Sequence, residues 1–420
     1  MMHVFLFILY FFVLCLIITR LGFFRGYIRP VYLILLFSLH VATGCLHNWI
    51  AFHYYPGHGD IWVFFEEGIR LRKLFVYDPA SFFTFLDSTG FNITDTHKPL
   101  LDFQYQFFQR VNVLLNIFSF DNIYINTLLF SLPVFAGTMA LFKFFYKIYQ
   151  KPLPAFCSLL LPSVLFWTSV VYKDGVFYMA IGYFFYFLLF RGKPTPQRII
   201  LLLVCTFLMF ISRANALITL FPALLFFFLA EKLVTKKRAF VFTMLAALMV
   251  VILLNNLLAS GILTVVSERQ KDFQSLEGGS RIALPVLEPS IQSALHILPT
   301  AFANGFFQPF PGVGGKSIYL AFSVELMVYW ALILLAGWLL VRRKTLRLSN
   351  FDATCLLFAI PGMIIIGYMV PFAGAIIRYR SIYLPFLLAP FVNLLCSYPV
   401  AIATRIDNWL GRNIIIVSGK

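Results

Sequence analysis

Long apolar runs separated by clusters of basic residues are the feature that most constrains how this chain can fold. Runs of about 20 apolar residues are long enough to cross a bilayer as helices. Cytoplasmic loops are enriched in Lys and Arg, so the basic clusters mark one side of the membrane. The alternation predicts an all-α, polytopic transmembrane helical bundle. The clusters are Arg20, Arg25 and Arg29; Lys143, Lys147 and Lys151; Arg191, Lys193 and Arg198; Lys232, Lys236, Lys237 and Arg238; Arg342, Arg343, Lys344 and Arg347; and Arg405, Arg412 and Lys420.

The composition agrees with a membrane protein and excludes two other classes. The chain is 61% hydrophobic and only 12% charged, whereas a soluble domain is about 25% charged. A transmembrane barrel would show short alternating segments instead of these long runs. The net charge of +16 is concentrated in the segments expected to be cytoplasmic, where topology explains it, so no nucleic-acid partner is expected. The six cysteines fall in expected spans and are interpreted as packing residues.

We expect about eleven spans, with the N-terminus outside and the C-terminus inside. The chain is interpreted as a single transmembrane domain, 1–420, with outer loops at 51–122 and 259–317. Helical spacing of apolar residues in the first loop indicates amphipathic helices at the membrane interface. The expected spans are His3–Thr19, Val31–Ile50, Ile123–Phe142, Pro152–Val171, Gly175–Phe190, Ile199–Ile211, Ala214–Ala230, Ala239–Leu258, Ile318–Val341, Ala353–Phe372 and Ser381–Val400.

The outer side carries nearly all the acids, and its first candidate site follows the second span. In the segment Tyr55–Asp60, two glycines and a proline predict a tight turn that presents His58 and Asp60 at the membrane surface. Asp60 then opens an expected helix. It is interpreted either as a helix cap or as a general base at the boundary between water and lipid.

A second candidate is the short connection Tyr172–Gly175 between the fourth and fifth spans. Charged groups at that depth are costly unless they are paired or used. Lys173 and Asp174 are therefore interpreted either as a mutual ion pair that closes the turn, or as an anion-binding lysine with an aspartate that orients the ligand.

Arginines at outer junctions form the third candidate. Arg213 interrupts an apolar stretch, and Arg378 and Arg380 flank the junction before the last span. By the expected topology all three reach the same face as Lys173. Guanidinium groups suit phosphate oxygens, so these four cations predict an anion site; the alternative is that each arginine extends toward lipid phosphates. Glu325, inside the ninth span, is expected to face the bundle interior and to pair with one of these arginines or with a tyrosine.

Two other kinds of site are not supported by the sequence. The segment Gly312–Ser317 resembles a phosphate-binding loop, but Phe310 stands where its first glycine is required and no strand precedes it. No spacing of His, Cys and Asp matches a metal site. No cofactor is therefore expected, although a divalent metal stays open. His40 and His47 are interpreted as interior packing residues.

Taken together, these segments resemble the GT-C superfamily of polyprenyl-phosphate-sugar-dependent membrane glycosyltransferases. The resemblance rests on an acid just after an early outward span, on the long interfacial loop, and on three short stretches, Pro162–Gly175, Gln308–Pro311 with Glu325, and Arg378–Leu387. Many members of the superfamily carry paired acids, or a His-Pro-Asp-Glu run, after that span. Here the run is His-Gly-Asp-Ile, so Asp60 has no adjacent second acid, which lowers the expectation of a metal.

The resemblance implies a GT-C-like bundle in the cytoplasmic (inner) membrane with its active site on the outer, periplasmic side. The donor would be a polyprenyl-phosphate sugar, and the acceptor a glycan or a lipid. Asp60 would be catalytic, and His58, Lys173, Asp174, Arg213, Glu325, Arg378 and Arg380 would bind substrate. Two alternatives stay open: a polymerase or ligase of O-antigen or other surface polysaccharide, which needs no base at Asp60, and a transporter or flippase of lipid-linked sugars, which needs charged or broken helices near the midplane.

Overall fold

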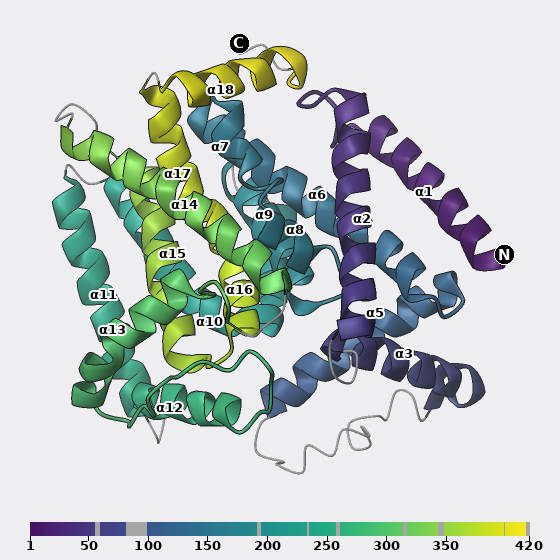
Figure 1. Ribbon diagram of the computed structural model, residues 1–420, viewed down its shortest axis with the longest axis horizontal. Helices are drawn as coiled ribbons and strands as arrows, with labels where there is room; N and C mark the ends of the chain where they lie inside the picture. The colour runs from purple at the N-terminus through teal and green to yellow at the C-terminus, as the bar shows by residue number, and fades with distance from the viewer. Residues whose placement is uncertain are drawn as a thin grey trace.

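The computed structural model is a bundle of helices (Figure 1). It describes residues 1–54, 59–80, 99–190, 195–232, 235–257, 261–313, 317–342, 348–398 and 400–416. Within these residues the regular structure is helical, apart from two isolated bridges, Ile28 with Ile415 and Arg281 with Phe372. His58 lies outside the described residues.

The helices run in this order: α1 (Met2–Arg20), α2 (Pro30–Tyr54), α3 (Gly59–Tyr77), α5 (Pro99–Ser119), α6 (Ile123–Tyr149), α7 (Pro152–Phe156), α8 (Pro162–Thr168), α9 (Lys173–Phe190), α10 (Pro196–Lys232), α11 (Lys236–Leu257), α12 (Gly261–Gln274), α13 (Ile291–Phe307), α14 (Ser317–Arg342), α15 (Asn350–Met369), α16 (Ala373–Ser381), α17 (Leu384–Ser397) and α18 (Ala401–Asn413).

The chain is a multi-pass helical membrane protein. In the described residues six helices are long and apolar enough to cross a membrane, and the number rises to eight if two sharply bent helix pairs each count as one span. The α6 and α9 helices form the centre, where the aromatic rings of Phe144 and Phe185 stack at 4.8 Å. All six cysteines are free, and four of them are buried, in line with a packing role.

Two of the expected spans differ in the structure. The continuous span expected over Pro152–Val171 is wrong, because prolines start two short helices there, α7 and α8, and α8 meets α9 at 110°. The two spans expected on either side of Arg213 belong to one long element, α10, which is kinked where Arg213 leaves helical geometry. The predicted break at Arg213 is therefore confirmed as a kink within one helix, not as a loop between two spans.

The second expected outer loop contains a helix that belongs to the bundle. The α13 helix packs along α15 so closely that a Cβ added to Gly367 would lie 1.8 Å from the carbonyl oxygen of Ala301. Such contact requires a residue without a side chain. The prediction that residues 259–317 lie on the outer side stays a prediction, and the helices that the spacing of apolar residues predicts in the first outer loop are found as α3 and α5.

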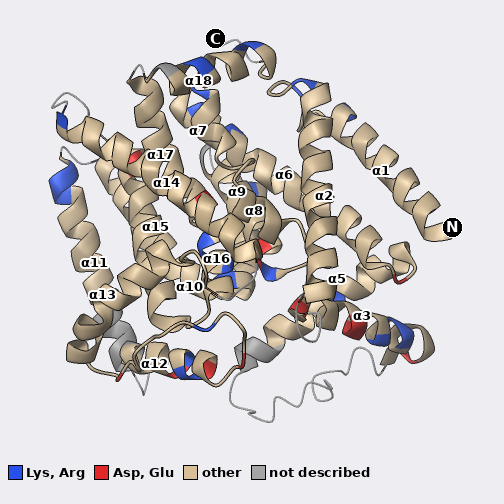
Figure 2. Ribbon diagram, in the orientation of Figure 1, with Lys and Arg blue, Asp and Glu red and all other residues tan. Residues whose placement is uncertain are grey.

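Charged residues separate along the bundle (Figure 2). Basic segments gather at the end that carries α18, the start of α11 and the connection between α1 and α2, whereas α3 and α12 at the other end carry both acidic and basic residues. This is the distribution expected from the basic clusters of the sequence, and α16 lies between the two ends with basic residues of its own.

Candidate functional site

The sharp turn between α8 and α9 positions the first two charged residues of the site. Gly175 allows the turn to be tight, since a Cβ there would lie 2.7 Å from the carbonyl oxygen of Thr168. The turn places Lys173 and Asp174 in the first turn of α9. A carboxylate at that position is favoured by the unpaired amides and the dipole of the helix N-terminus.

Asp174 is the centre of an ion-paired cluster. Its side chain is fully buried and accepts hydrogen bonds from two arginines on different helices. One carboxylate oxygen accepts from Nε of Arg213 at 2.9 Å and from its Nη2 at 2.6 Å. The other accepts from Nε of Arg378 at 2.7 Å. Asp174 thus joins α9 to α10 and α16. Its negative charge offsets part of the desolvation cost of burying two guanidinium groups.

The kink in α10 brings Arg213 into this cluster. Arg213 has φ −152° and ψ 70°, outside the helical region. Its guanidinium lies 3.8 Å from the ring centroid of Tyr379, so it is held by a ring on one face and by Asp174 along one edge.

Arg378 connects the buried aspartate to a second, more accessible one. Its Nη1 lies 3.6 Å from a carboxylate oxygen of Asp60, and its guanidinium stacks 3.7 Å from the ring centroid of Tyr172. The hydroxyl of Tyr172 donates a hydrogen bond to the same Asp60 oxygen. The Asp60 side chain is 58% exposed, in contrast to the fully buried Asp174. Asp60 therefore presents an oriented carboxylate to whatever approaches the site.

Lys173 completes the cluster without using Asp174. It donates to Oε1 of Gln104 at 3.2 Å and lies 4.5 Å from the ring centroid of Tyr105, both on α5. The mutual ion pair of Lys173 with Asp174 is therefore wrong for the described residues, because the arginines occupy Asp174. Burial, and then the charge of Asp60, raises the pKa of the Tyr105 phenol above its usual value.

We call these five residues the Asp174 cluster: Asp60, Lys173, Asp174, Arg213 and Arg378. Three basic side chains thus lie close to two carboxylates. The arginine side chains are only 10% and 14% exposed and turn inward to Asp174. The alternative that each extends to lipid phosphates therefore does not describe Arg213 or Arg378.

Arg380 does not join the cluster. Its Nη1 donates to the carbonyl oxygen of Gln308 at 2.6 Å and approaches that of Gly305 at 3.3 Å, so it satisfies carbonyls at the end of α13. The reason is helical geometry. Residues two apart point in directions that differ by roughly 200°, so Arg378 and Arg380 cannot both face Asp174. Placing Arg380 in the anion site was wrong.

Glu325 also lies outside the cluster. It accepts hydrogen bonds from the backbone N–H and the hydroxyl of Ser163, both at 2.9 Å, and from the hydroxyl of Tyr329. The predicted pairing of Glu325 with a tyrosine is therefore confirmed, and that tyrosine is Tyr329. Because Ser163 is in the first turn of α8, Glu325 caps the helix that leads into the turn, and its contacts are structural.

Three contributing residues were not singled out from the sequence. Tyr172 and Tyr379 each adjoin a predicted residue and form the faces on which the arginines stack. Gln104 belongs to the Phe103–Phe108 segment, whose mixture of Gln and aromatic residues was the only available signal. His40 and His47 are buried as expected, and His47 stacks on Phe166 at 4.0 Å.

Among the described residues no group of three or more His, Cys, Asp and Glu side chains could hold a metal ion. Comparison of the chain with family models, with curated proteins and with solved structures found no match. The resemblance to the GT-C superfamily accordingly stays a prediction.

Proposed function

We propose that this protein is a membrane glycosyltransferase that moves a sugar from a polyprenyl-phosphate carrier to an acceptor at the outer face of the cytoplasmic membrane. The observation that carries the proposal is the distance of 3.6 Å between Arg378 and Asp60. A guanidinium, which suits phosphate oxygens, and an exposed carboxylate, which can accept a proton, are the two kinds of group that such a transfer requires.

In the proposed reaction Asp60 takes the proton of the acceptor hydroxyl while the hydroxyl oxygen attacks the anomeric carbon. The bond between that carbon and the phosphate oxygen breaks, and the anomeric centre is inverted. The electron pair leaves with the polyprenyl phosphate, whose growing negative charge is stabilised by preorganised cations. Tyr172 supports this role because its hydroxyl fixes one Asp60 oxygen and leaves the other for the acceptor.

The hydrogen bonds divide the cations into two roles. Arg213 points two nitrogens at Asp174, so its main effect is to hold the buried carboxylate and α10 in place. Arg378 gives Asp174 only its Nε, and Lys173 gives Gln104 one of its three donors. Arg378 and Lys173 are therefore the proposed phosphate ligands, and losing one such contact should raise the barrier by about 2–4 kcal/mol.

The proposal is tested by reconstituting the chain in vesicles and measuring sugar transfer from a panel of polyprenyl-phosphate sugars. Asp60→Asn should abolish transfer without changing expression or thermal stability, since the side chain is exposed. Arg378→Gln should reduce transfer by a factor of roughly 30–1000. Glu67→Gln, on the same helix as Asp60 and paired on the surface with Arg70, is the matched control and should retain full activity.

The same variants separate the alternative activities. Full activity of Asp60→Asn together with inactive Arg378→Gln would favour the polymerase or ligase. Movement of a lipid-linked sugar across the bilayer without any covalent change would favour the transporter, and both results contradict the proposed transferase.

A further inference from the structure

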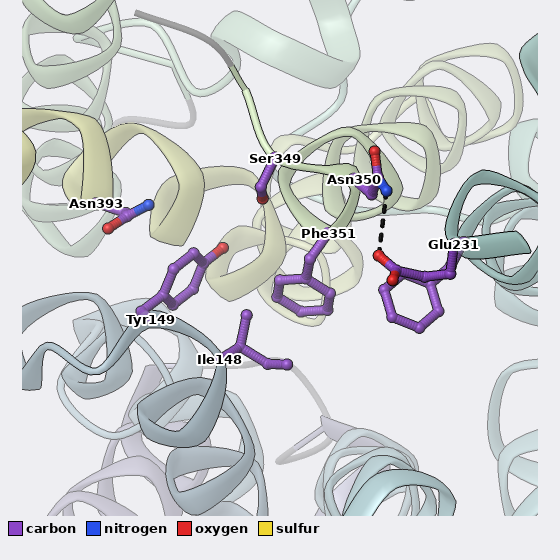
Figure 3. Close-up of a pocket in the computed structure, with 8 residues that line it drawn as sticks. Ile148, Tyr149, Glu231, Ser349, Asn350, Phe351 and Asn393 are labelled. Carbon is purple, nitrogen blue, oxygen red and sulfur yellow. Dashed lines mark hydrogen bonds between the residues drawn. The ribbon is translucent and has the colours of Figure 1, made fainter. Parts of the chain in front are cut away.

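A cavity of about 370 Å³ lies far from the Asp174 cluster. Ser349, which lies on the cavity wall, caps the start of α15, whereas Arg378 is in α16, beyond the other end of α15. The α15 helix has 20 residues and is therefore roughly 30 Å long. The volume is within the range of roughly 300–1,000 Å³ that is usual for small-ligand sites. The residues that form its walls include Tyr149, Phe227, Glu231, Asn350, Phe351 and Asn393 (Figure 3).

The cavity combines aromatic rings with one carboxylate. The ring of Phe351 lies 5.7 Å from that of Tyr149 and 6.2 Å from that of Phe227. Beside them, Oε1 of Glu231 accepts a hydrogen bond from Nδ2 of Asn350 at 3.1 Å (Figure 3). Glu231 makes no ion pair with any residue that the structure describes. Aromatic rings next to a carboxylate form a favourable environment for an organic cation.

The helix ends around the cavity favour a cation as well. Tyr149 is in the last turn of α6 and Glu231 is in the last turn of α10, so the negative ends of both helix dipoles are nearby. The α15 helix begins at this wall, and its capping box already pairs the backbone N–H groups of Ser349 and Asp352 with side-chain oxygens. These two donors are therefore not available to an anion.

Cations at the rim suggest what the ammonium group is attached to. Lys151 donates to Oδ1 of Asn393 at 3.3 Å and to Oγ of Ser397 at 2.5 Å. Lys236 donates to the carbonyl oxygen of Leu348, which precedes the wall residue Ser349. We propose that this cavity binds an aminoethyl phosphate group, with its ammonium at Glu231 and the aromatic rings and its phosphate near the two lysines. The group could come from an aminophospholipid head group or from soluble phosphoethanolamine. This proposal is independent of the proposed transferase activity.

The experiment measures which lipid or solute the full-length, purified protein retains. Native mass spectrometry follows binding of phosphatidylethanolamine, phosphatidylcholine and phosphatidylglycerol from detergent micelles, and calorimetry follows binding of soluble phosphoethanolamine. Glu231→Gln keeps the size of the side chain and its hydrogen bond from Asn350 but removes the charge. Glu288→Gln, an exposed glutamate elsewhere in the chain, is the matched control. Because both positions are exposed, neither variant should change the unfolding temperature in the absence of ligand.

We expect phosphatidylethanolamine to bind at least about tenfold more tightly than phosphatidylcholine, since a primary ammonium donates hydrogen bonds that a quaternary one lacks. Glu231→Gln should remove this preference and Glu288→Gln should keep it. Binding of soluble phosphoethanolamine with the same sensitivity to Glu231→Gln supports a solute site, and binding of the lipid alone supports a lipid site. Equal binding of phosphatidylglycerol, or an unchanged preference in Glu231→Gln, would overturn the proposal.

Discussion

Replacing Asp174 by asparagine tests the architecture of the site most severely. The carboxylate is fully buried and accepts three hydrogen bonds from Arg213 and Arg378. Asparagine offers one acceptor oxygen, so its NH₂ group must face one of the two guanidinium groups. Both arginine side chains are at most 14% exposed, and they would stay buried without a compensating charge. Breaking a buried ion pair from one side costs about 3–5 kcal/mol, so we expect Asp174→Asn to lower stability by that amount.

The assay is thermal unfolding of the purified protein in detergent, in which a loss of this size lowers the midpoint by several degrees. The control is Glu67→Gln, which breaks the exposed pair with Arg70 and should cost less than about 1 kcal/mol. If Asp174→Asn unfolded at the same temperature as the unmodified protein, the two arginines would not depend on Asp174. The ion pairs of the Asp174 cluster would then contribute nothing to stability.

Three further changes probe other parts of the structure. Gly367→Ala should destabilise the protein by at least about 1–3 kcal/mol, because its Cβ would collide with the Ala301 carbonyl. Gly337→Ala, inside α14 and with nothing within 4 Å of its Cβ, should not destabilise the protein in the same unfolding assay, because alanine favours a helix more than glycine does. Arg380→Met should lower the unfolding temperature, since it leaves the carbonyls at the end of α13 unpaired, and any loss of transfer should accompany this loss of stability. A loss of transfer at an unchanged unfolding temperature would return Arg380 to the substrate site. Tyr172→Phe should lower the transfer rate by about tenfold at unchanged stability, because it removes the donor that orients Asp60; an unchanged rate would show that this hydrogen bond is not needed.

The sequence predicted the membrane class and the main charged residues for reasons that are local. Apolar length and basic clusters depend only on neighbours in the chain, and a charge inside an apolar stretch, such as Arg213, is conspicuous without a structure. Helices in the first outer loop were visible for the same reason, because their apolar residues repeat with helical spacing.

What the sequence did not predict depends on contacts between distant segments. The partner of Asp174 could not be deduced from its neighbour Lys173, because the two arginines that bind Asp174 are 39 and 204 positions away. Arg380 was misplaced because helical phase matters more than proximity in the chain. The sequence does not single out the α13 helix, because the close packing that stabilises it, at Gly305 and Gly367, needs no long apolar run.

The central claim is that Arg378 binds the phosphate of a lipid carrier while Asp60 acts on the acceptor. Binding of polyprenyl phosphate to the purified protein, measured for the unmodified chain, Arg378→Gln and Asp60→Asn, tests it most directly. We predict that Arg378→Gln weakens binding by roughly 10–100-fold. Asp60→Asn removes a competing negative charge 3.6 Å from Arg378, so it should bind at least as tightly as the unmodified protein. Unchanged binding in Arg378→Gln, or binding lost in Asp60→Asn, would contradict the account.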